Sequence, residues 1–266
     1  MIINYTSTFV IIASCWIAGL ILLYLPIKFL SVKKKVANLL LITGAAILLF
    51  YIGNLWFVLE RPPFKTLGET RLWYAFFLAG IGLILYFIRK MSWVPFFSMS
   101  FAFLFLIINL IHPENFDKTL MPALQSLWFV PHVIVYIFAY SLLFASTIVA
   151  FKGLIGLYKK TYLPETLILA DKIVFIGFGF LTFGLLFGAL WAKEAWGNYW
   201  TWDPKETWSF LTWLLYLIYI HYRHYYKKAV KSPLFILTIA FIILLICWFG
   251  VNYLPSAANS VHTYTN

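Results

Sequence analysis

The chain has 266 residues, of which 63% are hydrophobic and only 11% are charged, and its mean hydropathy is +0.89. Because soluble domains carry about 25% charged residues, this composition excludes an ordinary soluble domain. The net charge of +11 does not indicate nucleic acid, since the cations follow membrane topology, and we expect no nucleic-acid partner.

Apolar runs recur along the whole chain, each close to the roughly 20 residues that a helix needs to cross about 30 Å of hydrocarbon. They lack the alternation of barrel strands, so they are predicted to be α-helices. The gaps between them are too short to fold separately. We therefore predict an all-α polytopic integral membrane protein that forms one transmembrane domain, 1–266, with about eight spans: 8–30, 38–58, 71–89, 93–111, 129–151, 171–191, 206–226 and 233–252.

The distribution of cations predicts the orientation of these spans. With residue 2 outside, most of the 20 Lys and Arg residues lie inside, including the run Lys33 to Lys35, and the external loops are near neutral. This arrangement obeys the positive-inside rule and places both termini outside. Cys15 and Cys247 lie within predicted spans and are not part of a CxxC pair, so we interpret them as core residues. The first span is expected to be retained, because no cation precedes it and its apolar run continues past Cys15.

Tryptophan is concentrated between residues 191 and 208, which hold five of the chain's 12 tryptophans. One interpretation is an interfacial aromatic belt. Belts, however, are spread over many helix ends, and here the other outward ends carry few tryptophans. The alternative is a platform for a large flat aromatic ligand, formed by the indole faces.

A helix start is encoded within the same segment. Asp203 at the N-cap, Pro204 at the first helical position and Glu206 three residues after the cap match a capping pattern. The alternative for the two carboxylates is general acid and base chemistry. Gly197 is expected to allow a turn of the backbone or a close approach to a ligand.

The five histidines differ in their predicted depth. His132 and His262 are predicted on the external side, where two imidazoles can occupy both axial positions of a haem iron. His221 lies 15 residues after Glu206, or about 22 Å along a helix, and is either a ligand or a partner in an interhelical hydrogen bond. We expect His112 to be solvated and His224 to be interfacial. Neither an HExxH motif nor a zinc-type Cys/His array is present in the sequence.

The segment from Trp196 to Trp208 resembles the WWD signature of the haem-handling protein superfamily. With Glu194-Ala195 before it and Pro204 to Thr207 within it, the segment is similar to the CcsA (ResC) branch of System II cytochrome c biogenesis. The resemblance extends from about residue 124 to the C-terminus, whereas the first four spans match only in general hydropathy.

This resemblance implies a function and a set of site residues. In the family, two external histidines hold haem b beside the WWD segment, and His221 pairs with a histidine of a CcsB (ResB)-like membrane subunit in an earlier, membrane-embedded site. Haem would move to the external site and be offered to the CxxCH thiols of apocytochrome c, as in a CcsBA-type holocytochrome c synthase. The implied haem-binding residues are His132, His262, His221, Trp196, Gly197, Trp200, Trp202, Asp203 and Glu206, with the three histidines as the metal ligands.

The resemblance implies no catalytic residue beyond those that present haem, and it allows an external thiol reductant as a further partner. The implied location is the bacterial cytoplasmic membrane, or the thylakoid membrane for a plastid protein, with the WWD segment outside. A rival hypothesis is an exporter of haem or another aromatic solute without synthase activity. A di-haem electron carrier would need histidine pairs on facing spans, and only one embedded histidine is convincing.

Overall fold

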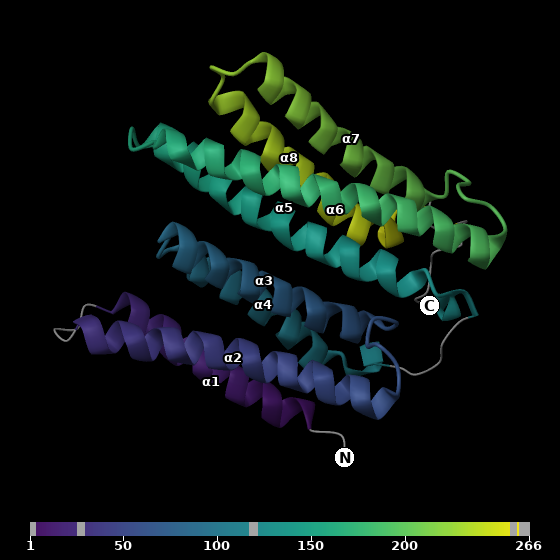
Figure 1. The fold of residues 1–266 in the computed structure, drawn as a ribbon, viewed down its shortest axis with the longest axis horizontal. Coiled ribbons are helices and arrows are strands. Elements are labelled where there is room, and N and C mark those ends of the chain that lie inside the picture. Colours follow the sequence, from purple (N-terminus) through teal and green to yellow (C-terminus); the bar gives the residue numbers. More distant parts are fainter. Residues whose placement is uncertain (1–3, 26–29, 117–121, 256–259, 261–266) are drawn as a thin grey trace. The chain divides into compact units, whose positions relative to one another are not determined.

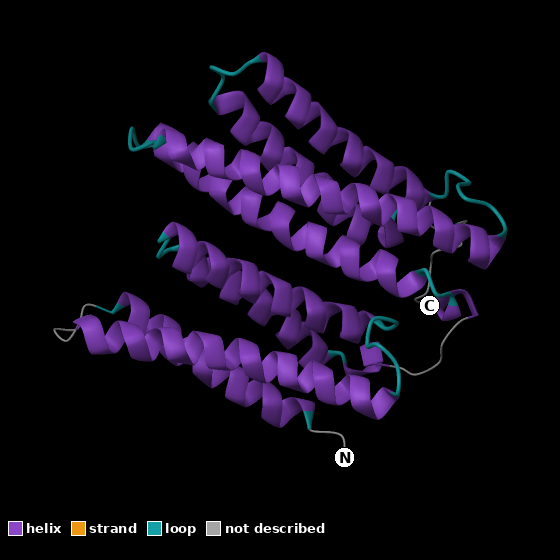
Figure 2. Ribbon diagram, in the orientation of Figure 1, coloured by secondary structure: helices purple, strands orange, loops and turns teal. Residues whose placement is uncertain are grey.

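The computed structural model describes residues 4–25, 30–116, 122–255 and 260. Across these residues the regular structure is entirely helical (Figures 1 and 2), which confirms the predicted fold class. The eight α-helices are α1 (Tyr5–Tyr24), α2 (Leu30–Leu59), α3 (Leu67–Arg89), α4 (Val94–Ile111), α5 (Phe129–Tyr158), α6 (Pro164–Trp196), α7 (Pro204–Tyr225) and α8 (Lys231–Trp248). Three short 3-10 turns accompany them, η1 (Pro113–Phe116), η2 (Pro122–Gln125) and η3 (Gly250–Tyr253).

The described helices include 7 that are long and apolar enough to cross a membrane. They are α1 to α6 and α8, so the chain is a multi-pass membrane protein. The remaining helix, α7, has 22 residues, which gives about 33 Å at about 1.5 Å per residue and is enough to cross the hydrocarbon. It is less apolar than the others because tyrosine, tryptophan, histidine and arginine replace aliphatic residues along it.

Several helix boundaries differ from the predicted ones. Helix α1 ends at Tyr24, two residues before Pro26, rather than at residue 30, because proline disfavours helical backbone in the residue before it. Helix α6 has 33 residues rather than the predicted 21, or about 50 Å at about 1.5 Å per residue. Residues 191 to 196 therefore belong to α6 rather than to the connection after it, and only residues 197–203 of the tryptophan segment lie between helices.

The described residues group into two compact units, residues 1–120 and 121–266, and each is described by itself. In the first unit, α1 packs mainly against α2, and α3 against α4. Polar contacts join these pairs: Tyr5 Oη donates to the carbonyl of Leu106 at 2.7 Å, and Tyr86 Oη donates to Asn38 Oδ1 at 2.9 Å. The prediction of a single domain over 1–266 stays a prediction.

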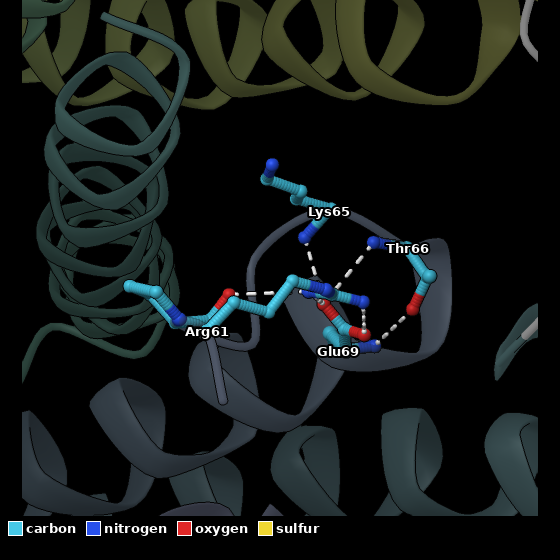
Figure 3. Close-up of polar contacts among 5 residues, drawn as sticks. Arg61, Lys65, Thr66 and Glu69 are labelled. Carbon is cyan, nitrogen blue, oxygen red and sulfur yellow. Dashed lines mark hydrogen bonds and ion pairs between the residues drawn. The ribbon is translucent and has the colours of Figure 1, made fainter. Parts of the chain in front are cut away.

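The connection between α2 and α3 is organised by the buried carboxylate of Glu69 (Figure 3). Arg61 Nη1 and Nη2 donate to its two oxygens at 2.9 and 2.8 Å. The backbone N–H groups of Lys65 and Thr66 donate to Oε2, and Thr66 Oγ1 accepts from the Glu69 N–H, which completes a capping box. The start of α3 is thus fixed by a charged pair and a cap together.

The second unit is a bundle of four antiparallel helices, α5 to α8 (Figure 1). Helix α5 packs against α6 and α8, and α7 packs against α8 and α6. The start of α5, the α6–α7 connection and the end of α8 lie at one end of this bundle, which we call the α6–α7 end. The opposite end, the α7–α8 end, carries the cations Lys159, Lys160, Arg223, Lys227 and Lys228. Chain direction alone therefore brings His132 and the tryptophan segment to the same end.

Candidate functional site

His132 lies in the first turn of α5 and its ring is held against α6. Its Nδ1 is 2.9 Å from the carbonyl oxygen of Gly184. Because a carbonyl can only accept a hydrogen bond, the Nδ1 atom carries the proton. In the neutral ring, Nε2 is then the unprotonated nitrogen, which is the form that ligates a metal.

Two glycines of α6 make this close approach possible. A Cβ atom added at Gly188 would lie 2.8 Å from His132 Cε1 and 2.9 Å from its Nδ1, and one added at Gly184 would lie 2.5 Å from Cδ2 of Tyr136. The two glycines are four residues apart and share one face of the helix. Small residues at this spacing let helices approach closely in membranes. The α5–α6 contact is therefore shaped around the imidazole.

Two aromatic side chains, Trp191 and Tyr136, pack against the His132 ring. Trp191 stacks on the imidazole with ring centroids 5.4 Å apart and an angle of 23° between planes, and Tyr136 meets it edge-on at 4.8 Å. Trp196 meets Trp191 at 4.7 Å, and the indole N–H of Trp191 donates to the carbonyl of Ala123 at 2.8 Å. Both tryptophans are positioned by helical backbone.

Gly197 ends α6 with a left-handed backbone, φ 84°, as predicted for a turn. Its N–H donates to the carbonyl of Lys193, and its own carbonyl accepts from Lys193 Nζ at 2.7 Å. The ammonium of Lys193 also lies 5.4 Å from the centroid of the Tyr199 ring. The chain therefore reverses immediately after Trp196.

The predicted cap of α7 is confirmed, because Asp203 and Glu206 form a reciprocal capping box with Pro204 in the first turn. Asp203 Oδ1 accepts from the Lys205 N–H at 2.9 Å. Glu206 Oε2 accepts from the N–H groups of Asp203 at 3.1 Å and Thr201 at 2.8 Å. Both carboxylates are buried and occupied by backbone donors, an arrangement that supports a structural role.

A second aromatic pair lies in the α6–α7 connection. Trp200 and Trp202 meet edge-on at 5.7 Å, and Trp202 also contacts Phe210 of α7. Trp202 has φ 60° and is 63% exposed, whereas the indole N–H of Trp200 is buried without a hydrogen-bond partner among the residues described. An unmet buried donor is costly, and it is a place where a ligand acceptor can bind.

Ser260 also contacts this connection. Its Oγ donates to Asp203 Oδ1 at 2.9 Å, and the residue is buried. His262, the predicted second axial ligand, lies outside the described residues. Its pairing with His132 stays a prediction.

The other histidines have different surroundings. His221 is exposed on α7, and its Nδ1 is 2.9 Å from the carbonyl of Leu217 in the same helix, so this bond does not join two helices as the alternative prediction required. His112 follows α4 and lies 2.7 Å from Glu114 Oε1, with both side chains exposed. His224 is exposed beside Tyr225 at the α7–α8 end.

Sequence reasoning missed four residues that contribute to the site. Gly184 and Gly188 had a detectable signal, the small-xxx-small spacing on α6. Tyr136 follows His132 by one helical turn, a spacing that places both on one face. Ser260 carried no signal, because its partner Asp203 is distant in sequence.

Comparison with known proteins extends this picture. Residues 66–258 match the family described as Cytochrome C assembly protein. The chain belongs to this family. The match begins at the start of α3, so it includes two helices of the first unit and reaches further than the predicted start near residue 124.

The relatives that this chain matches are named cytochrome c biogenesis protein CcsA, which confirms the resemblance to CcsA. The protein from Panax ginseng is 28% identical over 282 residues, covering 88% of this chain and 86% of the relative. The Cuscuta reflexa protein is 29% identical, with 88% and 85% covered. The Chlamydomonas reinhardtii protein is 41% identical over 149 residues, covering 53% of this chain and 42% of the relative.

Proposed function

We propose that this protein acts in cytochrome c biogenesis as the haem-handling subunit of a cytochrome c synthase. It would receive haem b at a membrane-embedded site, hold it at the α6–α7 end of the second unit, and present it to the CxxCH segment of apocytochrome c. Membership of the CcsA family supports the general role. The finer assignment rests on the geometry around His132.

The observation that carries the proposal is the hydrogen bond between His132 Nδ1 and the Gly184 carbonyl. It selects the tautomer in which Nε2 has a lone pair for iron, and it fixes the ring plane. Stacking on Trp191 restrains the same ring from its face. An imidazole with its tautomer and plane both fixed suits an axial ligand of haem.

His262 is proposed as the second axial ligand. The support comes from Ser260, two positions earlier in the sequence, whose hydroxyl binds Asp203 in the α6–α7 connection. Two neutral histidine ligands favour low-spin iron with the porphyrin between them. The exposed face of Trp202, together with Trp196, Gly197 and Trp200, would then border the porphyrin.

Trp200 is proposed to bind a carboxylate of the haem, because its buried indole N–H has no partner among the described residues. A porphyrin propionate is an acceptor of suitable strength for such a donor. Asp203 and Glu206 would act indirectly, since their oxygens cap α7 and hold Thr201 and Ser260.

His221 is proposed as the ligand of the earlier site, paired with a histidine of a CcsB (ResB)-like subunit. Its side chain is exposed on α7, where a neighbouring subunit can reach it, and its Nδ1 is again bonded to a carbonyl. We propose, following the positive-inside rule, that this site would lie in the inner half of the bacterial cytoplasmic or thylakoid membrane, with the tryptophan segment outside.

The bond-forming step needs no nucleophile from this chain. Each CxxCH thiol adds its sulfur and its hydrogen across one vinyl double bond of the haem, so electrons balance without an external oxidant. The thiols must be reduced beforehand, which calls for an external thiol reductant. The protein would contribute orientation of the vinyl groups and exclusion of side reactions.

The test is the absorption spectrum of the purified full chain, produced with and without its partner subunit. We expect low-spin bis-histidine bands that His132→Gly removes and added imidazole partly restores. His112→Gly is the matched control and should leave the bands unchanged. Unaltered bands in His132→Gly would refute the ligand assignment.

A second assay separates the synthase from the rival exporter. Cells that produce the chain, the partner subunit and an apocytochrome are examined for covalently attached haem. Thioether formation that depends on His132 supports the synthase. Haem delivered outside without thioether formation would instead identify an exporter.

A further inference from the structure

A partly buried charged network lies at the α7–α8 end of the second unit, far along the bundle from His132. Asp171 of α6 accepts from Tyr219 Oη at 2.5 Å through Oδ1. Arg223 donates to the same carboxylate from Nε at 3.0 Å to Oδ1 and from Nη2 at 2.9 Å to Oδ2. The side chains of Arg223 and Asp171 are only 15% and 16% exposed.

The guanidinium of Arg223 also holds the connection to α8. Its Nη1 donates to the carbonyl oxygens of Ala229 at 3.2 Å and Lys227 at 3.4 Å. One side chain therefore joins α6, α7 and the α7–α8 connection. Bidentate contact of a planar guanidinium with a carboxylate fixes direction as well as distance.

The positions of these residues on α7 determine where His221 points. Tyr219 and Arg223 are four residues apart and lie on one face of the helix. At about 100° per residue, position 221 is about 200° from each of them, on the opposite face. The burial agrees, because Tyr219 is 1% exposed whereas His221 is exposed.

We infer that Asp171, Tyr219 and Arg223 are positioning residues for His221: they set the rotation of α7 about its axis and so direct the imidazole out of the unit, toward an iron porphyrin shared with a neighbouring subunit. This inference rests on the proposed function of His221. A single ion pair to Asp171 could form at several rotations of α7 about its axis. The two-atom contact with Arg223 and the additional bond from Tyr219 together fit only one rotation.

The first experiment tests the rotation without haem. In the full chain with Cys15→Ala and Cys247→Ala, a nitroxide is attached at His221→Cys, and its accessibility to oxygen and to a water-soluble nickel complex is measured in nanodiscs. Asp171→Ala should change both accessibilities at position 221. A label at Ile176→Cys, an exposed position of α6, is the control and should not change.

Two further variants make this test sharper. The exchange Asp171→Arg with Arg223→Asp restores the ion pair and should return the label to its original environment. Tyr219→Phe removes one hydrogen bond and should give a smaller change than Asp171→Ala. Tyr219→Phe also retains the buried ring, so it provides a result if Asp171→Ala fails to fold. Unchanged accessibility at position 221 in both Asp171→Ala and Tyr219→Phe would overturn the inference.

The second experiment measures haem with the partner subunit present, in a His132→Gly background that removes the outer ligand. Asp171→Ala should lower the amount of haem retained by several-fold. The exchange of Asp171→Arg with Arg223→Asp, measured with added imidazole, should restore the amount retained. Full retention in Asp171→Ala contradicts the inference. If His221→Gly itself retains haem, the assignment of His221 in the proposed function is what fails, and the accessibility data still decide the rotation.

Discussion

Ser260 and Asp203 are joined by a 2.9 Å hydrogen bond although they lie 57 positions apart in the chain. Asp203 is also the N-cap of α7, so one carboxylate oxygen organises the start of a helix and anchors the segment that follows α8. The cap of α7 and Ser260 therefore share one carboxylate.

Loss of the Ser260–Asp203 hydrogen bond is predicted to reduce haem retention strongly and to lower the stability of the fold only slightly. Ser260→Ala removes the hydroxyl, while Asp203 keeps its bond to the Lys205 N–H. One neutral hydrogen bond contributes about 0.5–1.5 kcal/mol. We expect a small change in melting temperature and a clear loss of bis-histidine absorption, measured on the same preparation. Thr238→Val, in which a hydroxyl bonded within α8 is lost, should leave the absorption unchanged.

Gly188→Ala is predicted to displace His132. The new methyl group would lie 2.8 Å from Cε1 of the ring, and overpacking of this kind costs about 1–3 kcal/mol. Haem titration should give a dissociation constant raised by roughly tenfold, since about 1.4 kcal/mol corresponds to that factor. The matched control is Gly179→Ala on the same helix, where a methyl group meets nothing within 4 Å. Equal affinities in the two variants would show that the ring does not need this contact.

Trp200→Phe is predicted to reduce haem affinity while leaving the fold intact. The change keeps an aromatic ring and removes the buried N–H that has no partner among the described residues. Because an unmet buried donor destabilises the ligand-free protein, thermal stability should stay level or rise as affinity falls. Trp202→Phe makes the same chemical change at a 63% exposed position and serves as the control. Affinity that falls in Trp202→Phe and not in Trp200→Phe contradicts the proposed donor.

Glu206→Ala is predicted to lower stability and disorder the α6–α7 connection. Its Oε2 holds the N–H groups of Asp203 and Thr201, and loss of helix-capping interactions typically costs about 0.5–2 kcal/mol. Glu206→Gln keeps an acceptor oxygen and should be milder in a melting experiment. If the carboxylate were instead a general acid or base, Glu206→Gln would abolish thioether formation at unchanged stability.

Arg61→Ala is predicted to destabilise the first unit without changing haem absorption. Glu69 is 2% exposed, and removing one partner of a buried ion pair costs about 3–5 kcal/mol. Denaturation of the detergent-solubilised protein measures this change. Arg89→Ala, at an exposed position of α3, should change stability by less than about 0.5 kcal/mol.

Much of the helical fold was predictable from the sequence, because long apolar runs permit only one spanning structure. The positions at which the helices end were harder to predict. Helix α6 continues through Lys193 and Glu194, charged residues that lower the hydropathy of a sequence window, and through Ala195; all three are good helix formers. Propensity, rather than hydropathy, was the signal for the last turn before Gly197.

The candidate site likewise has features that local sequence determines and features that depend on contacts between helices. The cap of α7 and the turn at Gly197 follow from local rules, and both were predicted. The contact of His132 with Gly184 spans 52 positions, so it depends on which faces of α5 and α6 meet. The outward direction of His221 likewise depends on its neighbours at positions 219 and 223, whose partner lies on another helix.

The unbroken length of α6 has a consequence for communication along the second unit. Asp171, near its start, contacts the helix that carries His221, while Gly184, Gly188 and Trp191, nearer its end, contact His132. No joint interrupts the backbone between them. A translation or tilt of α6 as a rigid body would change the surroundings of His132 and His221 at the same time. Binding of a porphyrin at one histidine would then affect the other through the helix backbone itself.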